Sequence, residues 1–185
     1  MIRRQVIPMK ALLVFGTRWG GTVSVANIIA QALRERNYLV DVIDARENHP
    51  NAAEYDVIIV GSGIRADQWT KETLKFLQNN AEILRQKKTA LFVSCQLADG
   101  EKEGRQKAKE AYLLKIAEKY RLNPVAFGLF GGFLDFRESH GLLVDIIVRF
   151  NRRNLRRNGL DIRKTYDARN WDEIKKWATE VADAC

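Results

Sequence analysis

The chain of 185 residues has little of what several protein classes require. It holds two cysteines and two histidines, which with its scattered carboxylates show neither a disulfide framework nor the spacing of a metal site. No apolar run approaches the length of a membrane span, and residues 1–8 lack the apolar core of a signal peptide. We therefore expect a cytoplasmic protein. The length and a hydrophobic content of 46% predict a single domain, 1–185.

Negative charge is also scarce, because 31 Lys and Arg residues face 23 Asp and Glu residues, for a net charge of +8. Residues 149–164 hold seven basic residues and one acid, so most of the excess lies there. The apolar run 142–150 leads into this cluster, and 142–157 resembles an amphipathic helix at a membrane surface. The competing interpretation is a buried helix with a solvated basic end. An anionic membrane surface or an acidic partner is expected to contact Arg149, Arg152, Arg153, Arg156 and Arg157.

The clearest functional signal lies in residues 11–22. The five apolar residues 11–15 predict a strand buried on both faces, and a turn rich in Gly and Thr separates them from apolar positions at helical spacing. A strand, a tight turn and a helix N-terminus form an anion site, because backbone N–H groups and the helix dipole point at the turn. Thr17 and Thr22 add hydroxyl donors and Arg18 adds positive charge. The pattern predicts a phosphate ligand, and the competing interpretation is a glycine turn that merely starts a helix.

Two common phosphate motifs are missing from this turn. Gly21 occupies the place of the Walker lysine, which argues against nucleotide hydrolysis, and the dinucleotide pattern of three spaced glycines is absent. The turn instead resembles the FMN phosphate loop of flavodoxins, whose usual form is Thr-x-Thr-Gly-Asn-Thr. The aligned residues are Thr17-Arg18-Trp19-Gly20-Gly21-Thr22, with Trp19 in place of a hydroxyl residue and Gly21 in place of the Asn.

Further along the chain, apolar runs alternate with helical patterns. Strands are predicted at 38–43, 57–60, 90–95 and 125–130, with helices at about 70–85, up to about 120, and at 171–181. This alternation predicts an α/β fold, a flavodoxin-like open five-stranded parallel sheet of order 2-1-3-4-5 with helices on both faces. The loops at 16–22, 61–69 and 94–104 would then border one crevice. A basic helical insert is expected at about 132–170, before the last helix, with 131–140 as a loop and 161–169 as a polar connection.

Nearly the whole chain resembles one branch of the flavodoxin superfamily, the flavodoxin-type quinone-dependent protoporphyrinogen IX dehydrogenases. The resemblance rests on Phe15-Gly16-Thr17-Arg18, on Gly61-Ser62-Gly63-Ile64-Arg65, on the basic insert, and on Asp161-Ile162-Arg163-Lys164 before Trp171-Asp172. It implies FMN as the cofactor and the flavin as the seat of the chemistry, with no catalytic side chain assigned.

The resemblance also implies which residues hold the flavin. The phosphate would lie on Thr17, Arg18, Trp19, Gly20, Gly21 and Thr22, and the ring between Ser62, Gly63, Ile64 and Arg65 on one side and Ser94, Cys95, Gln96 and Leu97 on the other. Trp69 is a candidate for stacking on the ring, with packing at the start of a helix as the alternative. Cys95 is expected to be a small buried apolar residue and not a redox thiol.

Three functions compete on this basis. The first is an FMN oxidoreductase that oxidises a porphyrinogen-type substrate with a quinone acceptor, in the cytoplasm or peripherally at the inner face of the membrane. The second is a soluble flavodoxin electron carrier that docks on an acidic redox partner. The third, a nucleic-acid-binding domain, is disfavoured because no aromatic residues are interleaved with the arginines for stacking on bases.

Overall fold

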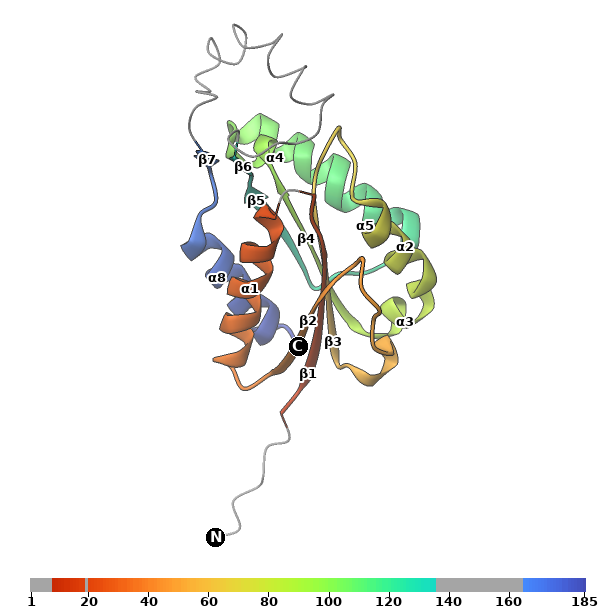
Figure 1. Ribbon diagram of the computed structural model, residues 1–185. Helices are drawn as coiled ribbons and strands as arrows, with labels where there is room; N and C mark the ends of the chain where they lie inside the picture. The colour runs from red at the N-terminus through yellow and green to blue at the C-terminus, as the bar shows by residue number, and fades with distance from the viewer. Residues whose placement is uncertain (1–7, 19, 136–164) are drawn as a thin grey trace, which may run out of the picture.

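Five parallel strands form the central sheet, in the order β2-β1-β3-β4-β5 (Figure 1). The structure is a computed structural model that describes residues 8–18, 20–135 and 165–185. The strands are β1 (Lys10–Gly16), β2 (Leu39–Asp44), β3 (Val57–Gly63), β4 (Lys88–Cys95) and β5 (Ala126–Gly131). The predicted fold and strand order are confirmed, and the order reverses between β1 and β3, where ligands bind in such sheets.

Helices cover both faces of the sheet (Figure 1). On one face lie α1 (Gly21–Arg34) and α8 (Trp171–Asp183), and on the other α2 (Lys71–Asn79), α3 (Ala81–Gln86), α4 (Lys102–Lys109) and α5 (Lys115–Tyr120). The alternation of β1 sets two cores, because Leu13 packs toward α1 and α8 while Leu12 and Val14 pack toward the other layer. Both layers fix the carboxyl edge of the sheet, where the predicted loops lie.

Two predicted helices differ in detail from the prediction. The helix expected over 70–85 is divided into α2 and α3 at Asn80, whose side-chain amide donates to the backbone carbonyl of Phe76 at 3.0 Å. Such side-chain bonds compete with the helix ladder. The helix that ends near residue 120 contains a five-residue π-helix, η3 (Glu110–Leu114), between α4 and α5. Short 3-10 turns, η1 (Ala52–Glu54) and η2 (Gln96–Asp99), complete the connections.

A two-stranded antiparallel ribbon replaces part of the expected loop and polar connection. β6 (Phe133–Asp135) pairs with β7 (Thr165–Asp167), although 131–140 was expected as a loop and 161–169 as a polar connection. That expectation was wrong at these residues, because strands of three residues carry no periodic signal and form only by long-range pairing. The ribbon lies at the end of the sheet where α1 begins (Figure 1).

The helical part of the basic insert, with Arg149, Arg152, Arg153, Arg156 and Arg157, falls within 136–164 and so lies outside the described residues. The predicted contact with an anionic surface stays a prediction for the same reason. Among the helices that the structure does describe, none is long and apolar enough to cross a membrane.

Candidate functional site

The turn from β1 into α1 has the geometry of an anion site. Gly20 is the N-cap residue of the 14-residue helix α1 and has a φ of 77°, in the left-handed region where glycine is favoured. No side chain caps the helix, and its first turn holds no acidic residue. The N–H of Val23 donates to the carbonyl of Gly20 at 3.0 Å, whereas the N–H groups of Gly21 and Thr22 have no side-chain acceptor among the described residues and can donate to a ligand. A Cβ at Gly20 would meet no atom of the described residues within 4 Å, so among these residues the space beside the donors is open.

The second loop meets this turn closely. A Cβ built on Gly63, the last residue of β3, would lie 2.8 Å from the hydroxyl oxygen of Thr22. Both Thr22 and Thr17 are buried, so their hydroxyls belong to the floor of the site and not to its solvated rim. Glycine at 63 is thus required for α1 to approach the end of β3. The residues expected to bind phosphate and those expected to border the ring come together here.

Ser62 supports the site from within the protein. Its hydroxyl donates to the backbone carbonyl of Gly63 at 2.9 Å and accepts from the backbone N–H of Thr70 at 3.0 Å. The residue is fully buried. The bond from Thr70 holds the end of β3 against the start of α2, and the bond to Gly63 lies within β3. With both bonds made inside the protein, this hydroxyl fixes the loop and is not presented to a ligand.

The loop after β3 is a tight turn held by reciprocal bonds between the backbones of Arg65 and Gln68, at 3.1 and 3.0 Å. Its two central residues, Ala66 and Asp67, have φ of 47° and 59°, which costs energy for residues with a side chain. The Asp67 carboxylate accepts a 2.5 Å hydrogen bond from the hydroxyl of Tyr112 in η3. Burial, followed by this bond, raises the pKa of Tyr112. The turn is therefore braced from the neighbouring helix.

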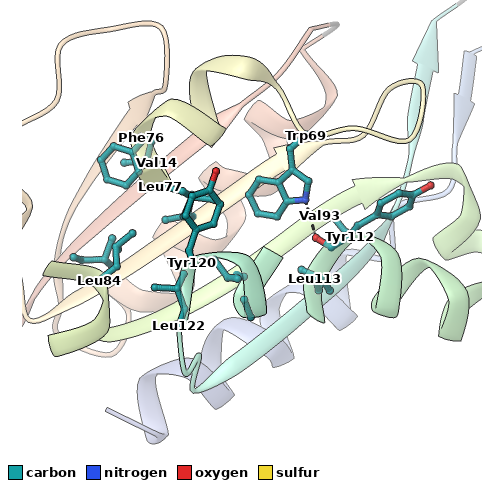
Figure 2. Packing of buried hydrophobic residues seen from close by; sticks show 14 of the residues in the cluster. Val14, Trp69, Phe76, Leu77, Leu84, Val93, Tyr112, Leu113, Tyr120 and Leu122 are labelled. Atoms are coloured by element: carbon teal, nitrogen blue, oxygen red, sulfur yellow. Dashed lines mark hydrogen bonds between the residues drawn. The ribbon is translucent and has the colours of Figure 1, made fainter. Parts of the chain in front are cut away.

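Trp69 packs into the core beside this turn. The residue is 4% exposed, and its indole N–H donates to the backbone carbonyl of Tyr112 at 2.7 Å (Figure 2). The ring belongs to the same apolar cluster as Phe76 and Leu77. So little exposed surface favours the packing interpretation over stacking on a flavin, and the stacking itself stays untested.

The end of β4 divides into buried and exposed residues. The Ser94 hydroxyl donates to the carbonyl of Gly131 at 2.8 Å, and the Ser94 carbonyl accepts from the N–H of Ile64 at 3.1 Å. Cys95 is buried, and desolvation raises the pKa of its thiol, as expected for a small apolar residue. Gln96 is exposed and Leu97 is 47% exposed, so their side chains are the ones available to a ligand.

Sequence reasoning missed one residue near this site. Arg169, just after β7, donates from its Nη1 to the carbonyl of Gly21 in the first turn of α1, at 3.0 Å. The signal that could have found it is a repeat, because the tripeptide Asp-Ala-Arg occurs at both 44–46 and 167–169. Only the second copy is followed by the aromatic residue Trp171 at the start of a helix.

The structure thus gathers most of the predicted residues at one edge of the sheet. The turn 17–22, apart from Trp19, which lies outside the described residues, adjoins Gly63, while Ile64 is bonded to the end of β4. Arg18 is exposed on the turn and Arg65 is half-buried. Backbone donors, buried hydroxyls and an exposed arginine make a donor set that fits a phosphate.

Comparison with known proteins agrees with this architecture. A family model described as a flavodoxin domain matches residues 12–150. A protein of Escherichia coli named protoporphyrinogen IX dehydrogenase (quinone) is 25% identical over 178 residues, which cover 94% of this chain and 95% of that protein. A flavodoxin structure from Streptococcus pneumoniae superposes with a TM-score of 0.58 at 16% identity, covering 95% of this chain and 99% of that one. A flavoprotein from Lactobacillus acidophilus, solved in complex with FMN, gives a TM-score of 0.50 at 13% identity, covering 65% and 93%.

Proposed function

The chain belongs to the flavodoxin domain family, and from this premise we propose that it is an FMN-dependent oxidoreductase that oxidises a porphyrinogen-type substrate with a quinone acceptor. The similarity to the Escherichia coli dehydrogenase extends along nearly the whole of both chains and supports this proposal. The flavodoxin-like structures show the fold alone, so the substrate class rests on that one resemblance.

The observation that carries the cofactor assignment is the turn at Gly20. A left-handed glycine at the helix N-cap, open space beside it and a first turn without acidic residues together suit a phosphate monoester. The turn also lies where the strand order reverses, between β1 and β3.

Each part of the site has a distinct task in this proposal. The first N–H groups of α1, with Thr17 and Thr22, would hold the phosphate, and Arg18 would add positive charge at the rim. The braced turn 64–68 and the exposed Leu97 would border the ring. FMN, when bound, supplies a centre that takes up electrons from a reduced substrate and passes them to an acceptor. Two electrons and two protons per cycle would leave the substrate and convert the quinone to a quinol.

The test begins with the absorbance spectrum of the purified protein and the identity of any cofactor released from it. We expect a visible flavin spectrum and FMN. Oxidation of protoporphyrinogen IX is then followed by porphyrin fluorescence, with and without a soluble quinone. Quinone-dependent oxidation supports the proposal, whereas a flavin-loaded protein that leaves the porphyrinogen unoxidised would restrict it to FMN binding and electron transfer.

A cavity on the edge of β5 favours a second candidate, the electron carrier that docks on an acidic partner. The cavity has a volume of about 610 Å³ and lies between α4 and α8. Its basic lining residues are Lys102, Arg105, Lys109 and Lys176, against the acids Glu173 and Glu180. Glu173 already pairs with Arg105, at 2.7 Å. The remaining excess of lysine would attract an acidic surface.

The two candidates differ in their response to charge reversal. If the protein is an electron carrier, changing Lys102 and Lys109 together to Glu should slow electron transfer to an acidic redox protein, and this effect should decrease at high salt. If the protein is a dehydrogenase, the same variant should oxidise porphyrinogen with the quinone at the rate of the wild type.

A further inference from the structure

The guanidinium of Arg169 is held by three hydrogen bonds and lies over two aromatic rings. It donates from Nε and Nη2 to the two carboxylate oxygens of Asp167, at 2.7 and 2.6 Å, and from Nη1 to the carbonyl of Gly21 at 3.0 Å. Its central carbon lies 4.3 Å from the ring centre of Phe133 and 4.6 Å from that of Trp171. The side chain is only 7% exposed. Such a buried, bidentate and stacked arginine has a fixed geometry that lysine cannot reproduce.

Backbone packing adds to this arrangement around the start of α1. A Cβ on Gly21 would lie 2.9 Å from the Cβ of Phe133, so β6 and the first turn of α1 are in direct contact. The N–H of Ala168 donates to the carbonyl of Gly132 at 3.0 Å, which closes the base of the ribbon. Phe133, Asp167, Arg169 and Trp171 therefore form a clamp on the first turn of α1, and we call these four residues the clamp below.

The helix that the clamp touches lacks the usual local device for fixing its start. An N-cap side chain normally bonds to an N–H of the first turn, but the N-cap here is Gly20, which has none. A turn that must present N–H groups to a ligand loses affinity when it has to be ordered on binding. Arg169 supplies a bond to the same turn from outside the helix.

We propose that Arg169 is a positioning residue of the phosphate turn, which holds the first turn of α1 in the conformation that receives the phosphate of FMN. This inference rests on the proposed FMN function. We assign Arg169 a role through the carbonyl of Gly21 and no direct contact with the phosphate, because three of its five N–H groups donate to Asp167 and Gly21 and its side chain is only 7% exposed. Its effect is therefore confined to the phosphate and does not extend to the flavin ring.

Comparing FMN with riboflavin tests this role, because riboflavin has the ring but no phosphate. The variants are Arg169→Gln and, as the matched control, Arg46→Gln, which breaks the same bidentate pair in the exposed copy of the tripeptide. Arg169→Gln should weaken FMN binding about tenfold, the usual effect of losing a charge-assisted hydrogen bond, and leave riboflavin binding unchanged. Arg46→Gln should bind both flavins as the wild type does. Equal losses for the two flavins, or unchanged FMN affinity, would overturn the proposal.

A second measurement does not depend on flavin. Hydrogen exchange of the amides at 21–23 in the flavin-free protein should be faster in Arg169→Gln than in Arg46→Gln, and unchanged protection would contradict the clamp. If Arg169→Gln fails to fold, Arg169→Lys takes its place, because lysine keeps the charge but cannot make the bidentate pair of a guanidinium. It should likewise weaken FMN binding, leave riboflavin binding unchanged and speed exchange at 21–23. A wild type that binds no flavin would refute the proposed function, while the exchange rates would still decide whether the clamp orders the turn.

Discussion

The tripeptide Asp-Ala-Arg occurs twice, and the two copies differ in almost everything except their own geometry. In each copy the arginine donates to the aspartate two residues before it, through Nε and Nη2, at 2.9 and 2.6 Å for Asp44 and Arg46 and at 2.7 and 2.6 Å for Asp167 and Arg169. Each copy begins at the last residue of a strand. Yet the side chain of Arg46 is 62% exposed and that of Arg169 is 7% exposed.

The difference shows that the tripeptide alone determines the bidentate Asp–Arg ion pair, whereas the surrounding residues determine what that pair does in the structure. Within the part of the chain that the structure describes, the guanidinium of Arg46 in the first copy bonds to Asp44 alone and is mostly solvated. Pairs with such an exposed partner contribute little to stability. The second is enclosed by Phe133 and Trp171 and bonded to Gly21. Enclosure makes the pair costly to break, because an unpaired buried cation has lost its hydration.

Removing the carboxylate from each copy should give the largest contrast. Asp167→Ala leaves the enclosed guanidinium of Arg169 without its counter-ion, and we expect it to lower the free energy of unfolding by about 2 kcal/mol. This value is below that of a fully buried pair because the Asp167 side chain is 37% exposed. Asp44→Ala should cost about 0.5–1 kcal/mol, because the guanidinium that it leaves behind is solvated, although the Asp44 side chain itself is only 12% exposed. Urea denaturation of both variants measures the contrast, and equal losses would show that enclosure does not matter.

The adjacent glycines at the start of α1 sharpen the comparison. Gly21→Ala forces a contact of 2.9 Å with Phe133 and should cost about 1–2 kcal/mol, whereas Gly20→Ala meets no atom but must keep a φ of 77°, at about 1 kcal/mol. A double-mutant cycle with Arg169→Gln separates the two effects. The cost of Gly21→Ala should fall when Arg169 no longer holds Phe133 in place, and that of Gly20→Ala should not change. Strict additivity at Gly21 would argue against the clamp.

Acid should expose a smaller difference between the copies. The hydrogen bond from Arg46 lowers the pKa of Asp44, and that from Arg169 lowers the pKa of Asp167. Because both values lie below the unfolded value of about 3.9, the stability that each contributes is present above that pH and is lost as the pH falls through the folded pKa. The decrease in the free energy of unfolding between neutral and acid pH should therefore be smaller in Asp167→Asn than in Asp44→Asn. We expect a difference of a few tenths of a kcal/mol, about the scale of a partly screened pair. Unfolding curves at pH 7 and at about pH 3 provide the check, and identical curves would contradict the expectation.

Much of the fold could be predicted because its signals are local. The apolar runs 11–15 and 57–60 are long enough to identify central strands, and their alternation with helices sets the sheet order. The ribbon of β6 and β7 was not predicted, because pairing between residues some thirty positions apart leaves no periodic trace in the three residues of each strand.

The site was predictable in its backbone and less so in its side chains. The glycines of the turn at 16–22 and Gly63 indicated a close approach between the two loops, and the structure has one between Gly63 and Thr22. That Ser62 bonds inward and Trp69 bonds to the carbonyl of Tyr112 depends on tertiary partners that no pattern identifies. The repeated tripeptide could have drawn attention to Arg169, but its enclosure by Phe133 and Trp171 depends on tertiary partners that the tripeptide does not identify.

The central claim is that FMN binds at the carboxyl edge of the sheet with its phosphate on the turn before α1. Titration of the isotope-labelled protein with FMN, followed through its backbone amide resonances, tests this most directly. We expect the largest shifts at Gly20, Gly21 and Thr22 for the phosphate and at Ile64 and Leu97 for the ring. Riboflavin should move only the second group. Shifts confined to the lining of the β5 cavity, around Lys102 and Lys109, or no shifts at saturating FMN, would contradict the account.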